Sequence, residues 1–167
     1  MTNQYFANPY NTSVNGFYFT DYADYLEQAD NLKDDFGMPV EEFSLEFIDG
    51  DNAELFNLLE VNQATLKLWF DSMEELAGED LVRALYLAEY LNVSMADILD
   101  QLDDVMLFEG DARSYAENYI EDTGLLDEMP ENLRYYFDVD AFARDMLLSG
   151  DINEVEIQGT TYIATGC

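Results

Sequence analysis

The sequence predicts an α+β fold of three small consecutive lobes, with small antiparallel sheets at both ends and a helical middle. Short aromatic runs bounded by turn residues indicate strands near the start and the end of the chain. Apolar residues spaced three and four positions apart indicate helices between them. Hydrophobic residues make up 49% of the 167 residues, which is enough for one sizeable core or several small ones. We expect lobes at residues 1–61 (α+β), 62–103 (helical) and 104–167 (α+β).

The first lobe is predicted to contain three strands and one helix. Aromatic runs at residues 5–7 and 16–19 indicate two strands, and alternation over residues 42–49 indicates a third with one solvated face. Asp21 is placed to cap a helix over residues 22–35, which the following glycine and proline end. The apolar stripe expected on this helix consists of Tyr22, Tyr25, Leu26, Ala29, Leu32 and Phe36.

The middle of the chain is predicted to be helical. Residues 53–59 indicate a short helix, residues 62–76 a longer one, and residues 79–91 an almost wholly apolar helix that belongs at the centre. Ser94 opens a fourth helix and is predicted to form a capping box with Asp97. The side chains expected to face inward from the second and fourth helices are Leu66, Trp69, Phe70, Met73, Leu76, Met95, Ile98, Leu99 and Leu102.

The last lobe returns to a mixed pattern. The strands expected here are residues 105–108 and a closing hairpin of residues 153–158 and 160–164. The helices expected between them are residues 112–123, 130–137 and 139–146. Asp111 and Asp138 are placed to cap the first and third of these helices, and Gly124 to stop the first.

The charge of the chain limits its partners. It carries 37 Asp and Glu against six Lys and Arg, a formal net charge of −31. A polyanion of this strength avoids nucleic acid and anionic membranes, so its charge favours basic surfaces and cations. With one phosphate per about 1.7 Å of duplex axis, this charge matches roughly 50 Å of DNA. The large apolar content argues against a disordered acidic tail.

Compartment can be predicted from what the sequence lacks. No segment is long and apolar enough to predict a membrane helix, and no signal-peptide pattern is found at the start. The single cysteine, Cys167, has no partner for an intrachain disulfide, which fits a reducing environment. We therefore expect a cytoplasmic protein.

Catalysis is not expected. The chain has no His, which excludes a His-containing triad, His-bound zinc and an imidazole acid–base group. It has no glycine-rich phosphate loop, so phosphoryl transfer is not expected either. Pairs of carboxylates arise by chance when acids are this frequent, and they do not by themselves indicate a glycosidase. We predict a non-enzymatic protein without cofactor or metal.

A calcium site is one alternative. Between Asp49 and Glu60, acids stand at positions 1, 3 and 12 of an EF-hand loop. Ala53 occupies position 5, where a ligand is needed, and Glu54 occupies position 6, where a glycine allows the sharp turn. The pattern is incomplete, and turn or cap aspartates explain it equally simply.

Acids gather on the polar faces of four predicted helices with almost no bases between them. A solvated helix face ordinarily mixes both signs, because like charges at i,i+4 repel. Carboxylates three or four residues apart lie about 4.5–6 Å apart along a helix axis, which coarsely resembles the spacing of phosphates. The acidic surface predicted on these helices consists of Asp24, Glu27, Asp34, Asp35, Asp71, Glu74, Glu75, Asp97, Asp100, Asp103, Asp104, Glu117, Glu121 and Asp122.

Several stretches carry a family resemblance. The longest are residues 116–124 (AENYIEDTG) and 129–138 (MPENLRYYFD), followed by ARD at residues 143–145 and LSG at 148–150. The opening adds YFAN at residues 5–8, YN at 10–11 and GFYF at 16–19. In these stretches the chain resembles the ArdA-type antirestriction proteins of mobile elements, whereas its central helices are similar only in being acidic.

The resemblance implies an elongated, curved homodimer that mimics bent duplex DNA and occupies the DNA groove of type I restriction–modification enzymes. It also implies that the antirestriction motif and the dimer contacts lie in the C-terminal lobe, over roughly residues 125–145. Among these residues, Arg134 and Arg144 are expected to form internal ion pairs. The acids predicted to extend the phosphate-like surface are Asp127, Glu128, Glu131, Asp138 and Asp140. The residues predicted as motif core or dimer contacts are Leu133, Tyr136, Phe137 and Phe142.

The leading hypothesis is a non-catalytic DNA mimic that inhibits a type I restriction–modification enzyme by binding its methyltransferase and specificity core. One alternative is an acidic decoy for another DNA-binding protein, such as a CRISPR effector or a nucleoid protein. Another is a halophilic or calcium-binding acidic domain. Nucleic acid and membrane are not expected as partners.

Overall fold

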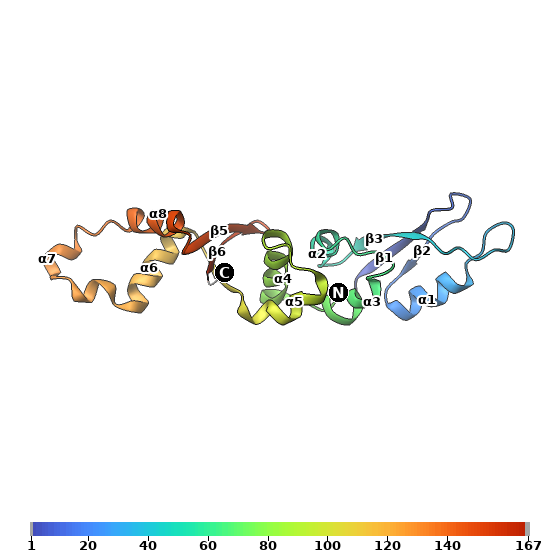
Figure 1. The fold of residues 1–167 in the computed structure, drawn as a ribbon, viewed down its shortest axis with the longest axis horizontal. Helices are drawn as coiled ribbons and strands as arrows, with labels where there is room; N and C mark the ends of the chain where they lie inside the picture. The colour runs from blue at the N-terminus through green and yellow to red at the C-terminus, as the bar shows by residue number, and fades with distance from the viewer. Residues whose placement is uncertain (1, 166–167) are drawn as a thin grey trace. The chain divides into compact units, whose positions relative to one another are not determined.

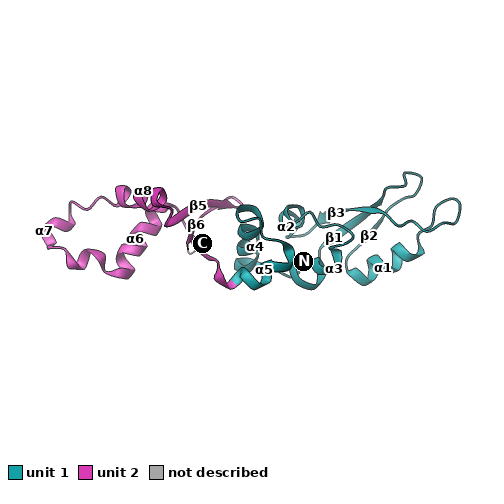
Figure 2. Cartoon of the chain, viewed as in Figure 1, with its two compact units in different colours: residues 1–102 teal, residues 103–167 magenta. Residues whose placement is uncertain are grey.

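A computed structural model describes residues 2–165 and divides the chain into two compact units, Met1–Leu102 and Asp103–Cys167 (Figure 1, Figure 2). The α+β class, the two small antiparallel sheets and the helical middle are confirmed. The division into three lobes stays a prediction. Cys167 lies outside the described residues.

The sheet of the first unit contains the three predicted strands. They are β1 (Gln4–Pro9), β2 (Phe17–Phe19) and β3 (Phe43–Asp49), in the order β2-β1-β3 with both pairs antiparallel. Tyr5 lies opposite Phe19 on one side and opposite Phe47 on the other. The central strand therefore places a fully buried tyrosine among aromatic neighbours on both flanking strands.

Tyr5 is the centre of the first unit's core. Its ring stacks on Phe19 at 5.3 Å and meets Phe70 edge-on at 5.2 Å. The indole N–H of Trp69 donates to the Tyr5 hydroxyl at 2.8 Å, so both polar atoms of this buried pair are satisfied. Burial raises the pKa of Tyr5 to about 12, despite the hydrogen bond from Trp69.

The first helix is shorter than predicted. Helix α1 (Tyr22–Asn31) begins where expected, with the Asp21 carboxylate accepting the N–H of Asp24 at 2.7 Å, but it ends four residues early. The chain then turns through Gly37, whose φ of +78° suits glycine. Phe36 was predicted to face inward from the helix. It lies in this turn instead and is 90% exposed.

The helical middle belongs to the first unit. Its helices are α2 (Ala53–Leu58), α3 (Leu66–Leu68), the π-helical η1 (Trp69–Met73), α4 (Gly78–Tyr90) and α5 (Met95–Gln101), followed by the 3₁₀ segment η2 (Leu102–Asp104). Helix α4 packs against both α2 and α5. Its buried side chains Leu81, Leu85 and Leu87 confirm the prediction of a central helix.

Three details of the middle differ from prediction. The expected helix over residues 62–76 opens with a turn in which the Asn62 side chain accepts the N–H groups of Ala64 and Thr65. The Ser94 hydroxyl donates to the Asp97 carboxylate at 2.8 Å instead of capping the backbone, so the predicted capping box is wrong. Leu99 was expected inside and is exposed.

The second unit contains the other sheet. Strands β4 (Met106–Glu109), β6 (Thr160–Thr165) and β5 (Ile152–Ile157) are antiparallel in that order, as the predicted hairpin requires. Helices α6 (Ala112–Thr123) and α8 (Val139–Ser149) pack on each other, and α8 packs on β5. The core consists of Ala112, Ala116, Ala143, Ile152 and Ile163.

The segment between α6 and α8 holds two short helical turns, η3 (Leu125–Glu128) and α7 (Glu131–Arg134). Neither turn has a buried residue. The Arg134 guanidinium donates to the carbonyls of Met129 and Asp127, both at 3.1 Å, and so closes the turn between them. The segment is thus ordered by polar contacts more than by apolar packing.

Candidate functional site: an acidic surface with an apolar segment

Both units carry the acidic surface. The first has 21 Asp and Glu against three bases, net −18, and the second has 16 against three, net −13. All nineteen acids predicted for the surface are exposed except Asp24, Asp34 and Glu74, which are partly buried. An excess of acids this large creates a negative electrostatic potential around both units. Repulsion among these carboxylates opposes folding into a compact state.

The densest part of the predicted surface follows two stretches of helix. In α5 and η2 the exposed acids are Asp97, Asp100, Asp103 and Asp104, and in α6 they are Glu117, Glu121 and Asp122. Successive members of each group are one to four residues apart, which corresponds to about 1.5–6 Å along a helix axis. Helical geometry therefore turns acid spacing in the sequence into rows of charge.

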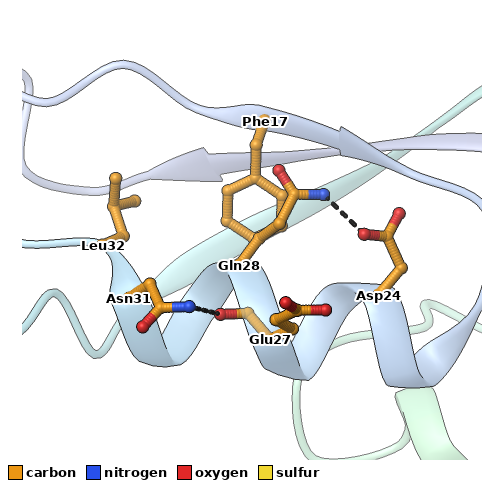
Figure 3. Close-up of a pocket in the computed structure, with 6 residues that line it drawn as sticks. All are labelled: Phe17, Asp24, Glu27, Gln28, Asn31 and Leu32. Atoms are coloured by element: carbon orange, nitrogen blue, oxygen red, sulfur yellow. Dashed lines mark hydrogen bonds between the residues drawn. The ribbon is translucent and has the colours of Figure 1, made fainter.

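The three partly buried acids all accept hydrogen bonds within the first unit. The Gln28 amide donates to Asp24 at 2.9 Å across an open hollow that α1 and Phe17 line (Figure 3). Glu74 accepts from the Asn3 side chain at 3.4 Å, and its burial, with the nearby charge of Glu75, raises the pKa of its carboxyl. These acids help to hold the fold, and because they are partly buried, their carboxylates are less accessible to a partner than those of the exposed acids.

Asp34 and Asp35 do not lie on a helix face as predicted. The Asp34 carboxylate accepts the backbone N–H groups of Phe36 at 2.9 Å and Met38 at 3.0 Å. Asp35 lies exposed beside it in the same turn. Such local bonding by an aspartate competes with helix continuation, which explains why α1 ends at Asn31.

Bases neutralise part of the predicted surface. Lys67 pairs with Asp71 at 2.7 Å, and Arg113 bridges Glu117 on α6 to Asp140 on α8. These pairs are solvent-exposed, so each contributes little to stability. Arg144 was predicted to form an internal ion pair, but it makes none with any residue from 2 to 165, and Arg134 bonds carbonyls instead.

The predicted motif core divides into two pairs. Phe137 and Phe142 are partly buried, with ring centroids 5.6 Å apart, and Phe142 packs against the core of the second unit. Leu133 and Tyr136 are exposed, Tyr136 by 78%. Tyr135 and Leu148, which the prediction omitted, are exposed as well. Leu133, Tyr135, Tyr136 and Leu148 are thus among the large apolar side chains that face solvent in residues 116–150.

The calcium alternative does not fit the local fold. Asp49 ends a β-strand, and α2 begins four residues later, so the segment is not a helix–loop–helix. Asn52 is buried and donates to the carbonyl of Leu76 at 2.9 Å, which gives it a structural role. Among residues 2–165, no group of three or more His, Cys, Asp or Glu is arranged to hold a metal ion.

Sequence reasoning missed two structural features of this surface. It did not assign Arg113, whose long side chain bonds Asp140, 27 residues later, and so joins α6 to α8. It also placed Phe36 in a core and said nothing of Met38, which is 61% exposed in the same turn. The Asp-x-x-Gly pattern of residues 34–37 signals a turn and could have placed Phe36 and Met38 outside a helix.

The described chain contains no helix that is long and apolar enough to cross a membrane. Compared with known families, residues 8–160 match the family described as antirestriction protein (ArdA). No curated protein sequence matches the chain at a significant level. The match covers most of both units, and it agrees with the one-signed acidic surface and with the motif in residues 116–150. The chain therefore belongs to the ArdA family of antirestriction proteins, non-catalytic DNA mimics that inhibit type I restriction–modification enzymes.

Proposed function

We propose that this chain occupies the DNA groove in the methyltransferase and specificity core of a type I enzyme, in the cytoplasm, and thereby excludes DNA. The observation that carries the proposal is the two rows of exposed carboxylates, one along α5 and η2 and one along α6, which stand in for phosphates. A DNA groove is lined with basic side chains that ordinarily bind phosphate oxygens. Carboxylates held on rigid helices meet those bases without the ordering cost of a flexible acidic tail.

The test is displacement of labelled DNA from a type I methyltransferase. We expect this chain to release the DNA completely at a small molar excess, and to lose affinity at least about tenfold between 0.1 M and 0.5 M salt, because screening weakens many charge contacts together. Fluorescence anisotropy of the DNA measures both effects. DNA that stays bound at a large excess of this chain would contradict the proposal.

A control separates this target from other DNA-binding proteins. The same titration is run on a nucleoid protein and on a CRISPR effector bound to DNA. Equal displacement from all three would indicate a general acidic decoy, whereas preference for the methyltransferase supports the proposed target. A chain stable only at high salt that displaces DNA from none of them would indicate salt adaptation.

We further propose that the chain acts as a homodimer through an apolar segment of the second unit. This segment consists of Leu133, Tyr135, Tyr136 and Leu148, all exposed in the single chain. Among them, the rings of Tyr135 and Tyr136 lie 5.7 Å apart. Several large apolar side chains that are exposed in one unit are typical of an interaction site. A second copy is the favoured occupant, because aromatic side chains are enriched in the apolar core of homodimer interfaces.

Replacing Leu133 and Tyr136 together by serine is expected to weaken the dimer at least about 100-fold, since central apolar contacts dominate such interfaces. Sedimentation at a range of concentrations measures the change. Tyr10→Ser is the matched control, because Tyr10 is also exposed but lies in the first unit. A double variant that sediments like the parent chain would refute the assignment of this segment.

A further inference from the structure

The turn between α1 and β3 displays two apolar side chains that the fold does not require. Phe36 is 90% exposed, more than any other large hydrophobic side chain among residues 2–165, and Met38 is 61% exposed. Figure 1 shows this connection, in light blue to cyan, projecting from the body of the first unit. Single exposed apolar residues are common, but two at one projecting tip form a distinct feature.

Backbone bonds hold this tip in one conformation. Asp34 accepts the N–H groups of Phe36 and Met38 with its side chain, and its own N–H donates to the Met38 carbonyl at 2.9 Å. The Gly37 N–H donates to the Asp34 carbonyl at 3.0 Å, and Lys33 pairs with Pro39 as a β-bridge. None of these bonds uses the Phe36 or Met38 side chain, so any residue other than proline could fill either position.

Acids surround the tip. Residues 33–42 carry Asp34, Asp35, Glu41 and Glu42 against the single base Lys33, a net charge of −3. Glu41 and Glu42 line an open hollow beside the turn, together with Tyr10. A second copy of this turn would bring like charges together, whereas a basic surface would be attracted by the same carboxylates.

We propose that Phe36 and Met38 form an apolar anchor that inserts into the arginine-bearing DNA site of the target, an inference that rests on the proposed function above. The Phe36 ring offers its face to a guanidinium, and the neighbouring carboxylates pair with further bases around it. The Met38 thioether fills irregular apolar space beside the ring. Because the turn is already ordered, little conformational entropy is lost on binding.

The anchor differs from the carboxylate rows in its response to salt. Coulombic contacts between exposed charges are screened as ionic strength rises, but contacts made by burying apolar surface are not. The anchor therefore supplies a part of the affinity that persists at high salt. This difference allows its contribution to be separated from that of the carboxylates.

The test of the anchor is DNA displacement by Phe36→Ser and Met38→Ser variants, measured from 0.1 M to 0.5 M salt. We expect Phe36→Ser to weaken displacement about tenfold at every salt concentration, with an unchanged salt dependence, and Phe36→Trp to restore it. Met106→Ser is the matched control for Met38→Ser, since Met106 is 65% exposed but lies on a strand edge in the second unit. Unchanged thermal unfolding confirms that the turn persists.

The outcomes separate the two proposals. If the parent chain displaces DNA and Phe36→Ser does so equally well, the anchor is refuted while the proposed function stands. If Phe36→Ser changes the sedimentation of the chain instead of its inhibition, the turn contacts a second copy and the anchor is likewise refuted. A parent chain that displaces no DNA overturns the function and the anchor together.

Discussion

Replacing Asp100, Asp103 and Asp104 together by lysine is expected to weaken DNA displacement at least about 100-fold. Each substitution turns a favourable contact with a basic groove into a repulsive one, and misplaced like charges at an interface cost several kcal/mol in total. With about 1.4 kcal/mol per tenfold change, two or three such contacts suffice. Anisotropy titration at 0.1 M salt measures the effect, and emission from Trp69, the chain's single tryptophan, reports whether the first unit remains folded.

The matched control reverses three exposed acids outside the predicted surface, Glu46, Asp51 and Glu60. Both triple variants carry the same net charge, so only the position of the charge differs. We expect the control to retain most of the inhibition and single Asp→Asn variants to retain nearly all of it, because the binding energy is spread over many weak contacts. Equal losses in the two triple variants would show that total charge, not its arrangement, determines binding.

Replacing Trp69 by alanine is expected to lower the free energy of unfolding of the first unit by about 3–5 kcal/mol. Trp69 is fully buried, meets Phe56 edge-on at 5.2 Å and donates its indole N–H to Tyr5. The substitution leaves a cavity and takes away the strongest hydrogen-bond partner of a buried hydroxyl. Urea unfolding followed by circular dichroism gives the change in free energy.

Two further variants separate the free energy lost with the hydrogen bond from the free energy lost with the buried ring. Trp69→Phe keeps an aromatic ring but removes the N–H, and it is expected to cost about 1–3 kcal/mol. Leu99→Ala alters a side chain that is 46% exposed and is expected to cost under about 1 kcal/mol. A Trp69→Ala variant as stable as Leu99→Ala would mean that the Tyr5–Trp69 pair is not central to this core.

The sequence located best those helices whose ends carry a capping residue or a glycine. Asp111 and Asp138 cap α6 and α8 as predicted, accepting the N–H groups of Ser114 and Ala141. Gly124 ends α6 in the left-handed conformation that glycine adopts without strain. Cap and turn preferences depend on a few neighbouring atoms, so they can be recognised before the tertiary structure is known.

The errors arose where a periodic pattern continued past the end of its element. The three-and-four spacing runs through Leu32 to Phe36, yet α1 ends at Asn31 because Asp34 bonds the backbone beyond it. Trp69 and Met73 were correctly placed inside, but the helix that carries them is π-helical at that point. Periodicity reports which residues are apolar, and it does not report where competing side-chain bonds stop a helix.

By itself, the sequence determined the sign and size of the charge, the α+β class and the motif in residues 116–150 that indicated the family, because composition and local patterns need no long-range contacts. Only the tertiary structure decided which apolar side chains stay outside the cores. Phe36 was predicted to face a core, and Tyr136 to be a motif-core or dimer residue, and both side chains are exposed in the single chain. Exposure depends on what packs over a residue from distant parts of the chain, and that is fixed only when the chain has folded.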